Sequence, residues 1–200
     1  MEVVLLASKV SGWAINIYFW MHIVAFLISW VNADPSNPFV SFVNRWTWPL
    51  WHAVGERCPR ALRPLSSYLA LMLIVFCEIF VPGLILSLGS GLLGEISMDS
   101  SLVKVAGYFL ISGVTVLSHL TQFVFLLSAI WFFVTLVNSP VSNPLVQSLY
   151  MVMDPLLTPI QRLLPRMKVD ISPLIIALVA YFASGFFRGL VPQLGMKFLA

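Results

Sequence analysis

The chain has 200 residues, of which 60% are hydrophobic and only 10% are charged. Soluble domains carry about a quarter of their residues as charged side chains, so this composition excludes an ordinary soluble domain and indicates an integral membrane protein. A net charge of +3 would suggest nucleic acid in a soluble protein. Here the placement of the charges matters more, and no direct nucleic-acid partner is expected.

Four long apolar runs account for this composition, and each is long enough to cross ~30 Å of hydrocarbon at ~1.5 Å per residue. No water satisfies backbone groups at that depth, so the runs must form helices. The expected fold is therefore all-α, a polytopic membrane protein with four transmembrane helices. The runs cover residues 10–31, 67–90, 114–137 and 173–193.

Two long loops, residues 32–66 and 138–172, hold most of the basic side chains. The positive-inside rule places both loops in the cytoplasm and both termini on the other side, in the periplasm of a bacterial inner membrane. The basic residues of the loops are Arg45, Arg57, Arg60, Arg63, Arg162, Arg166 and Lys168.

The two loops resemble each other, because "VNADPSNP" from Val31 returns as "VNSPVSNP" from Val137. With a shift of 106 positions, eleven of 36 loop pairs are identical and the flanking apolar runs align. The repeated unit is a span, a polar loop and a second span. A unit with two spans returns the chain to its starting side, so the two copies are expected to be parallel. They would cover residues 1–94 and 95–200.

Both loops contain N-cap residues that precede a proline, a pairing typical of helix starts. The second copy is expected to start three helices in this way, at 144, at 155 and at the fourth span, whereas the first copy keeps only one such pair. The pairs are Asn37-Pro38, Asn143-Pro144, Asp154-Pro155 and Ser172-Pro173.

Apolar residues recur at helical spacing within the loops, which predicts amphipathic helices with bends at Pro49 and Pro155. We expect these helices to lie at the cytoplasmic interface, with Trp46, Trp48 and Trp51 at headgroup level; the alternative is internal packing against the bundle. The expected apolar faces are Phe39, Val43, Trp46, Leu50 and Val54 in the first copy, and Leu145, Leu149, Val152, Leu156, Ile160 and Leu163 in the second.

Polar residues inside the spans are candidate functional residues. Glu78 and His22 lie at similar depths, ~17 Å and ~14 Å from the cytoplasmic ends of their spans. A contact between them, as a proton site or as a structural hydrogen bond, is one interpretation. Asn16 and Gln122 are equivalent under the repeat, and interhelical hydrogen bonds are the plain explanation for both.

The sequence contains no phosphate loop, HExxH, Cys-x-x-Cys or nucleophile triad, so we expect no enzyme, no catalytic residue and no metal ligand. Haem held between His22 and His119 is disfavoured because their depths, ~14 Å and ~27 Å, do not match. No cofactor is therefore expected.

Several short motifs recur in a fixed order, and together they resemble the YggT/YlmG family of small integral membrane proteins. They are Ser29-Trp30, Asn37-Pro38, Pro49-Leu50, Asn143-Pro144, "DPLLTPIQRLLP" from Asp154 to Pro165, and "DISP" from Asp170 through Ser172 to Pro173. The resemblance covers nearly the whole chain as two tandem copies. It implies an accessory factor in cell division and shape, osmotic tolerance, or nucleoid distribution and haem-protein maturation in plastids, and it brings no catalytic residues.

These observations predict a non-enzymatic membrane scaffold that organises partners or anionic lipid at the cytoplasmic face. A membrane-protein partner or a second copy of the chain is expected besides lipid. The alternative is a small channel or transporter subunit lined by Asn16, Gln122 and Glu78. The candidate lipid- or partner-binding residues are Arg45, Trp46, Trp51, Arg162, Arg166 and Lys168.

Overall fold

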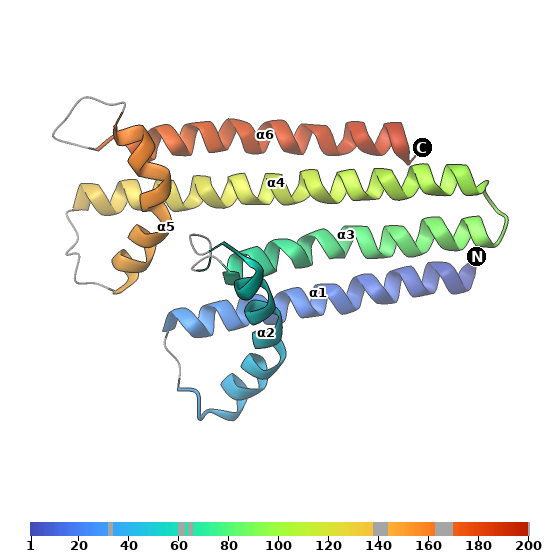
Figure 1. Ribbon diagram of the computed structural model, residues 1–200, viewed down its shortest axis with the longest axis horizontal. Coiled ribbons are helices and arrows are strands. Elements are labelled where there is room, and N and C mark those ends of the chain that lie inside the picture. The colour runs from blue at the N-terminus through green and yellow to red at the C-terminus, as the bar shows by residue number, and fades with distance from the viewer. Residues whose placement is uncertain (32–33, 60–62, 64–65, 138–143, 163–169, 200) are drawn as a thin grey trace. The chain divides into compact units, whose positions relative to one another are not determined.

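The computed structural model describes residues 1–31, 34–59, 63, 66–137, 144–162 and 170–199. Within these ranges the chain forms α-helices and no strands, which confirms the all-α prediction (Figure 1). Four helices are long and apolar enough to cross a membrane, namely α1, α3, α4 and α6. The helices are α1 (Glu2–Val31), α2 (Pro38–Arg57), α3 (Ser66–Leu92), α4 (Met98–Val137), α5 (Pro144–Gln161) and α6 (Ser172–Phe198).

Helix α4 begins earlier than the apolar run at 114–137 predicts, because a polar segment before that run is also helical. Ser97 precedes the helix, and its Oγ accepts a hydrogen bond from the backbone N–H of Ser100 at 3.2 Å. Asp99 lies in the first turn, where a carboxylate is favourable. The resulting 40 residues are ~60 Å long at ~1.5 Å per residue, about twice a hydrocarbon core.

A tight turn joins α3 to α4. Gly94 has a φ of 73°, a left-handed conformation that costs glycine little. The backbone N–H of Glu95 donates to Ser90 O at 3.0 Å, and that of Gly94 donates to Gly91 O at 3.1 Å. This is the Schellman arrangement, which satisfies the last carbonyls of a helix. The predicted repeat boundary at 94/95 falls in this turn.

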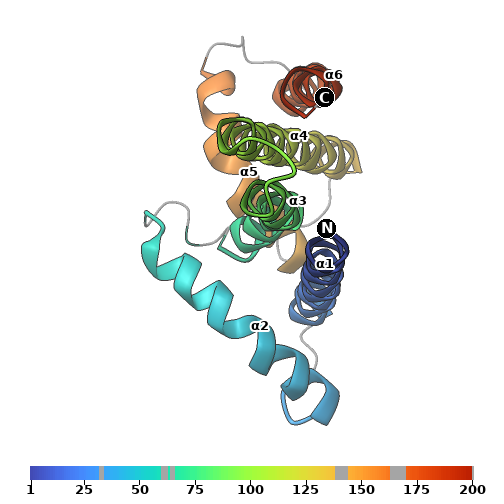
Figure 2. The same cartoon turned by 90° about the vertical axis from the view of Figure 1, so that its right-hand side faces the viewer.

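The chain divides into two compact units, Met1–Val116 with Arg188–Ala200, and Leu117–Phe187. In the first unit, α1 and α3 pack side by side and α2 crosses them near the end of α1 and the start of α3 (Figures 1 and 2). Helix α2 buries Val40, Val43 and Thr47. It therefore covers α1 and α3 near the end of α1 and the start of α3 (Figure 1).

In the second unit, α5 lies across the end of α4 and the start of α6 (Figure 1). Leu149 and Ile160 of the predicted apolar face pack against the buried residues of this unit. Leu157, outside that face, is only 2% exposed, whereas Leu156 of that face is 38% exposed. The buried cluster combines Leu127, Trp131, Val146, Met153, Leu157 and Ile176.

Pro155 does not start a helix as predicted. α5 continues from Pro144 to Gln161 through Pro155, and α2 continues through Pro49. The prediction of a helix start at Asp154-Pro155 is therefore wrong. Asp154 instead lies within α5 and accepts a hydrogen bond from Thr158 Oγ1 at 3.4 Å. A proline costs a helix one hydrogen bond, and here the surrounding helix persists despite that loss.

The other three predicted helix starts are close to the observed ones. Asn37 is the N-cap of α2, its side chain accepting from the Phe39 N–H at 2.9 Å, and Pro38 is the first helical residue. At α6 the cap differs from the prediction, because Asp170 Oδ1 accepts from the Ser172 N–H at 2.9 Å and Ser172 is already helical. α5 begins at Pro144, while Asn143 lies outside the described residues.

Candidate functional site

The polar residues of the spans meet in the first unit, at the contact between α1 and α3. Asn16 Nδ2 donates a hydrogen bond to Glu78 Oε1 at 2.7 Å, and both side chains are half-buried. Glu78 therefore pairs with Asn16. Among the described residues, the hydrogen bond between Glu78 and His22 that the sequence suggested is absent. This bond can serve a neutral or an ionised carboxyl group, since either has an oxygen that accepts.

His22 is fully buried on α1. Its Nδ1 lies 2.9 Å from the backbone carbonyl of Tyr18, and the Tyr18 ring meets the imidazole edge-on with centroids 4.3 Å apart. A carbonyl oxygen only accepts, so the proton must be on Nδ1. In the neutral ring Nε2 is then a hydrogen-bond acceptor.

Trp51 of α2 approaches the same imidazole. The two ring centroids are 6.0 Å apart and the planes are close to perpendicular. Among the described residues, neither His22 Nε2 nor Trp51 Nε1 has a hydrogen-bond partner, although both atoms are buried. One is an acceptor and the other a donor, so the pair has the chemistry to share a bridging group.

Helix α2 also has an exposed aromatic side, which lies about 100° around the helix from the face that packs on the bundle. Phe39, Phe42 and Trp46 are 60%, 56% and 57% exposed, and their spacing of three and four residues places them in one row. We call these three residues the α2 aromatic stripe. Arg45 is exposed beside it. Phe39 and Trp46 belong to the predicted apolar face, which was expected at the cytoplasmic interface, whereas Val43 of that same face packs inward with Val40 and Thr47.

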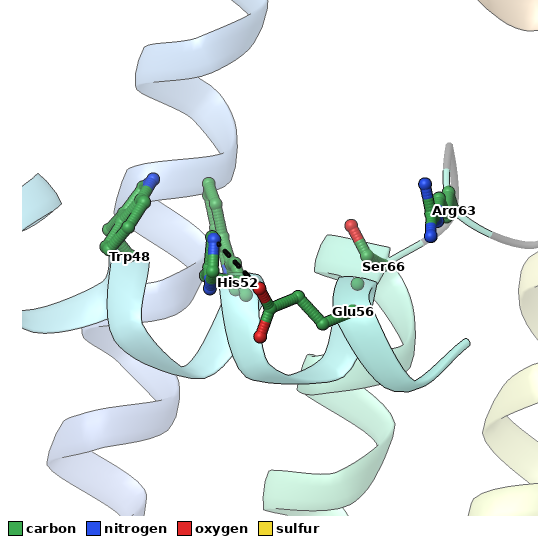
Figure 3. Close-up of a pocket in the computed structure, with 7 residues that line it drawn as sticks. Trp48, His52, Glu56, Arg63 and Ser66 are labelled. Carbon is green, nitrogen blue, oxygen red and sulfur yellow. Dashed lines mark ion pairs between the residues drawn. The ribbon is translucent and has the colours of Figure 1, made fainter.

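A groove of about 510 Å³ lies where the end of α2 passes the start of α3 (Figure 3). His52 Nε2 is 3.5 Å from Glu56 Oε1, and the His52 ring stacks against Trp48 with centroids 4.5 Å apart. The groove thus combines an aromatic wall with charges of both signs. Its lining residues are Trp48, Trp51, His52, Gly55, Glu56, Arg63 and Ser66.

In the second unit, the end of α5 is tied to the start of α6. Gln161 Nε2 donates to Asp170 Oδ2 at 2.6 Å, while the other carboxylate oxygen of Asp170 caps Ser172. Partial burial opposes ionisation of Asp170, but the hydrogen bonds from Ser172 and Gln161 outweigh it and lower its pKa below the ordinary value. The predicted DISP motif is therefore a structural link.

The remaining sequence candidates are dispersed. Gln122 is exposed on α4, and Arg162 is exposed just after α5. Trp51 is partly buried with its indole nitrogen enclosed, so it is no exposed interface residue. Arg166 and Lys168 lie outside the described residues. Within those residues no group of three or more His, Cys, Asp or Glu side chains is placed to hold a metal ion.

Sequence reasoning named Trp48, Trp51 and Arg63 but missed the groove itself and the roles of His52 and Glu56, although two patterns pointed to them. His52 and Glu56 are four residues apart, as are Trp48 and His52, and such pairs adjoin on a helix surface. Ser66, the first residue of α3, is one of the identical positions of the repeat, where it matches Ser172. The missing step was the crossing of α2 over α3, which brings these residues together.

Four membrane-length apolar helices, with an amphipathic helix across the helix ends of each unit, define a multi-pass membrane protein. Residues 108–193 match the family model described as CCB3/YggT. The predicted resemblance to the YggT family is therefore confirmed. The match covers one segment of the chain, which lies within the predicted second copy at 95–200, so the arrangement as two tandem copies stays a prediction.

Relatives of the same name extend this resemblance across most of the chain. The chain is 29% identical over 168 residues to "Uncharacterized protein YggT" of Escherichia coli strain K12, covering 84% of this chain and 81% of the relative. The proteins of the same name from strains O6:H1 and O157:H7 match equally well. No solved structure matches.

Proposed function

We propose that this protein is a non-enzymatic membrane scaffold, which holds anionic lipid or partner proteins at the cytoplasmic face of a bacterial inner membrane. In this topology the α2 and α5 regions are cytoplasmic and both termini are periplasmic. Cell division, envelope or osmotic-stress tolerance and membrane-protein assembly are processes such a scaffold would serve.

The α2 aromatic stripe carries the proposal. Three large aromatic side chains in one row are exposed on a helix whose adjoining face packs on the bundle. Water would penalise that much apolar surface by about 25 cal/mol per Å², whereas the headgroup region accommodates aromatic rings, tryptophan above all. An amphipathic helix in the plane of the interface resolves this cost.

The charges beside the apolar surfaces favour anionic lipid. Arg45 is exposed next to the stripe, and Arg162 is exposed after α5. A basic residue near an anionic leaflet contributes ~1 kcal/mol of attraction. Arg166 and Lys168 follow closely in the sequence and add to the positive charge of the second loop.

The alternative, a channel or transporter subunit, rests on Glu78 inside a span. Its bond to Asn16 at 2.7 Å weighs against it, because the carboxyl group is then engaged by a helix neighbour. Gln122, a further proposed lining residue, is exposed on α4. Packing explains these residues more simply than a conduction path.

The lipid proposal is tested with the full chain in nanodiscs that contain a fluorescent anionic lipid. Enrichment of that lipid around the protein is measured by energy transfer from the protein's tryptophans. Replacing Arg162, Arg166 and Lys168 with Gln should reduce the enrichment and its dependence on salt. Lys104→Gln, on the predicted periplasmic side, is the matched control. Unchanged enrichment in the triple variant would sink the proposal.

A further inference from the structure

The groove between the end of α2 and the start of α3 has a bipolar lining that the scaffold proposal does not use. Figure 3 places Arg63 and Ser66 together at one end and Trp48 with His52 at the other, with Glu56 between them. Its volume of about 510 Å³ lies in the range of small-ligand pockets, roughly 300–1,000 Å³.

The end with Arg63 and Ser66 suits a phosphate group. Arg63 supplies a guanidinium group, which pairs with phosphate oxygens through parallel N–H donors. Ser66 supplies a hydroxyl group and is the first residue of the 27-residue helix α3. The unpaired N–H groups of a helix start add partial positive charge at that point.

The opposite end suits a small cation. Glu56 is well exposed, and its carboxylate oxygen is 3.5 Å from His52 Nε2, a separation beyond the usual hydrogen-bond length. The carboxylate therefore keeps room to accept N–H donors. The face of Trp48 is a further partner for an ammonium group. A purely anionic ligand would instead be repelled by Glu56.

The depth of the groove points to a lipid. Ser66 is also the first residue of a candidate membrane span, so the groove lies at the boundary between headgroups and hydrocarbon. In the proposed function the α2 aromatic stripe holds α2, the other helix that lines the groove, at this same boundary. A ligand with a phosphate and an ammonium group at this depth is the headgroup of a zwitterionic phospholipid.

We propose that the groove of Trp48, Glu56, Arg63 and Ser66 binds the headgroup of one phosphatidylethanolamine molecule, with the phosphate at Arg63 and Ser66 and the primary ammonium at Glu56 and Trp48. Phosphatidylcholine has no N–H group that could donate a hydrogen bond to the Glu56 carboxylate. Phosphatidylglycerol lacks the cation altogether. The inference rests on the interfacial position of α2 in the proposed function, and it specifies a lipid that electrostatic attraction to Arg45 and Arg162 would not select.

The test is competition between lipids on the purified full chain. The chain is equilibrated in detergent with equal amounts of dioleoyl phosphatidylethanolamine, phosphatidylglycerol and phosphatidylcholine, and retained lipids are counted by native mass spectrometry. We expect one preferentially retained phosphatidylethanolamine. Arg63→Gln should lower its retention about tenfold, the effect of losing one charge-assisted hydrogen bond.

Glu56→Gln provides a readout that misfolding does not imitate. Removing the carboxylate should lower the preference for phosphatidylethanolamine over phosphatidylglycerol about tenfold, while lipid as such is still retained. Arg45→Gln is the matched control. It should reduce phosphatidylglycerol retention and leave the preferred phosphatidylethanolamine in place.

Several outcomes would overturn the assignment. These are equal retention of the three lipids by the unmodified chain, a Glu56→Gln variant with an unchanged preference, and displacement by soluble glycerophosphoethanolamine as effective as the lipid itself. The last outcome would identify a soluble headgroup compound as the ligand. If α2 is interfacial but no preference exists, this inference fails while the scaffold proposal stands.

Discussion

Asn16 of α1 and Glu78 of α3 are joined by a hydrogen bond of 2.7 Å inside the membrane-length part of both helices. Nearby, Ser8 Oγ of α1 donates to the backbone carbonyl of Pro82 at 3.0 Å. Pro82 has no N–H, so the helix lacks one internal donor, which would otherwise serve the carbonyl of Glu78. α1 thus holds α3 on both sides of the point where its helical hydrogen bonding is interrupted.

Breaking the Asn16–Glu78 bond should destabilise the first unit modestly. Asn16→Leu and Glu78→Leu are each expected to lower stability, with a coupling energy of ~0.6–1.7 kcal/mol in a double-mutant cycle, the range for such bonds in membrane proteins. Glu78→Gln keeps an accepting oxygen and should be nearly neutral. Thermal unfolding in detergent measures this, and Gln122→Leu at an exposed position is the control. If the stability losses of the two single variants simply add up in the double variant, the bond contributes nothing to stability.

The His22–Trp51 contact should contain a bridging water. Buried donors and acceptors without partners cost ~1–3 kcal/mol each, and a water with an acceptor on one side and a donor on the other removes both costs. Trp51→Phe is therefore expected to destabilise the fold by ~1 kcal/mol or more, whereas Trp46→Phe, on the exposed stripe, should not. Nitrogen NMR of His22 should report the proton on Nδ1. A neutral or stabilising Trp51→Phe would mean that the contact is dry.

Asp170 should make the link between α5 and α6 sensitive to acid. Its pKa is lowered in the folded chain, so its contribution to stability is full above the ordinary aspartate range near pH ~4 and is lost as the pH falls through the lowered value. Gln161→Ala removes the 2.6 Å hydrogen bond and should move that loss to higher pH. Unfolding temperatures measured from pH 7 to pH 2 test this. The same acid profile in Asp170→Asn and the unmodified chain would contradict it.

Two helical glycines provide a matched pair for packing. A Cβ at Gly83 of α3 would overlap the ring of Tyr108, whereas one at Gly113 of α4 would meet nothing within 4 Å. Gly83→Ala should therefore destabilise the first unit by ~1–3 kcal/mol through overpacking. Gly113→Ala should be neutral or stabilise the helix by up to ~1 kcal/mol. Equal effects of the two variants on the unfolding temperature would show that the Tyr108 side chain moves aside without a measurable cost in stability.

Composition and periodicity predicted the all-α fold, the four apolar helices and the start of α2 at Asn37 and Pro38. They did not separate the exposed from the packed side of the loop helices, because one residue turns a helix by about 100° and burial depends on which elements cross it. For the same reason Phe39 and Trp46 are exposed while Val40 and Thr47 are buried. The local sequence at Asp154-Pro155 also predicted a helix start, but in the packed structure α5 continues through these two residues.

The candidate polar residues were identified from the sequence, but their partners were not. Asn16 and His22 are six residues apart, about 240° around a helix, so only one of them can face Glu78. Which one does so depends on the rotation of α1 against α3, and no local pattern encodes that rotation. The groove could not be predicted either, because its two ends come from separate segments of the sequence. Only the crossing of α2 over α3 brings those segments together.

The central claim, that the α2 aromatic stripe lies in the lipid interface, is tested most directly by spin labelling. Cys58 and Cys77 are free thiols, so the double variant Cys58→Ser, Cys77→Ser provides a cysteine-free background. In that background one nitroxide label is attached at position 42 after Phe42→Cys, or at position 41 after Ser41→Cys as the control. In lipid vesicles a label at 42 should be relaxed more by oxygen than by a water-soluble nickel chelate, and a label at 41 should show the reverse. Equal, nickel-dominated relaxation at both positions would contradict the account.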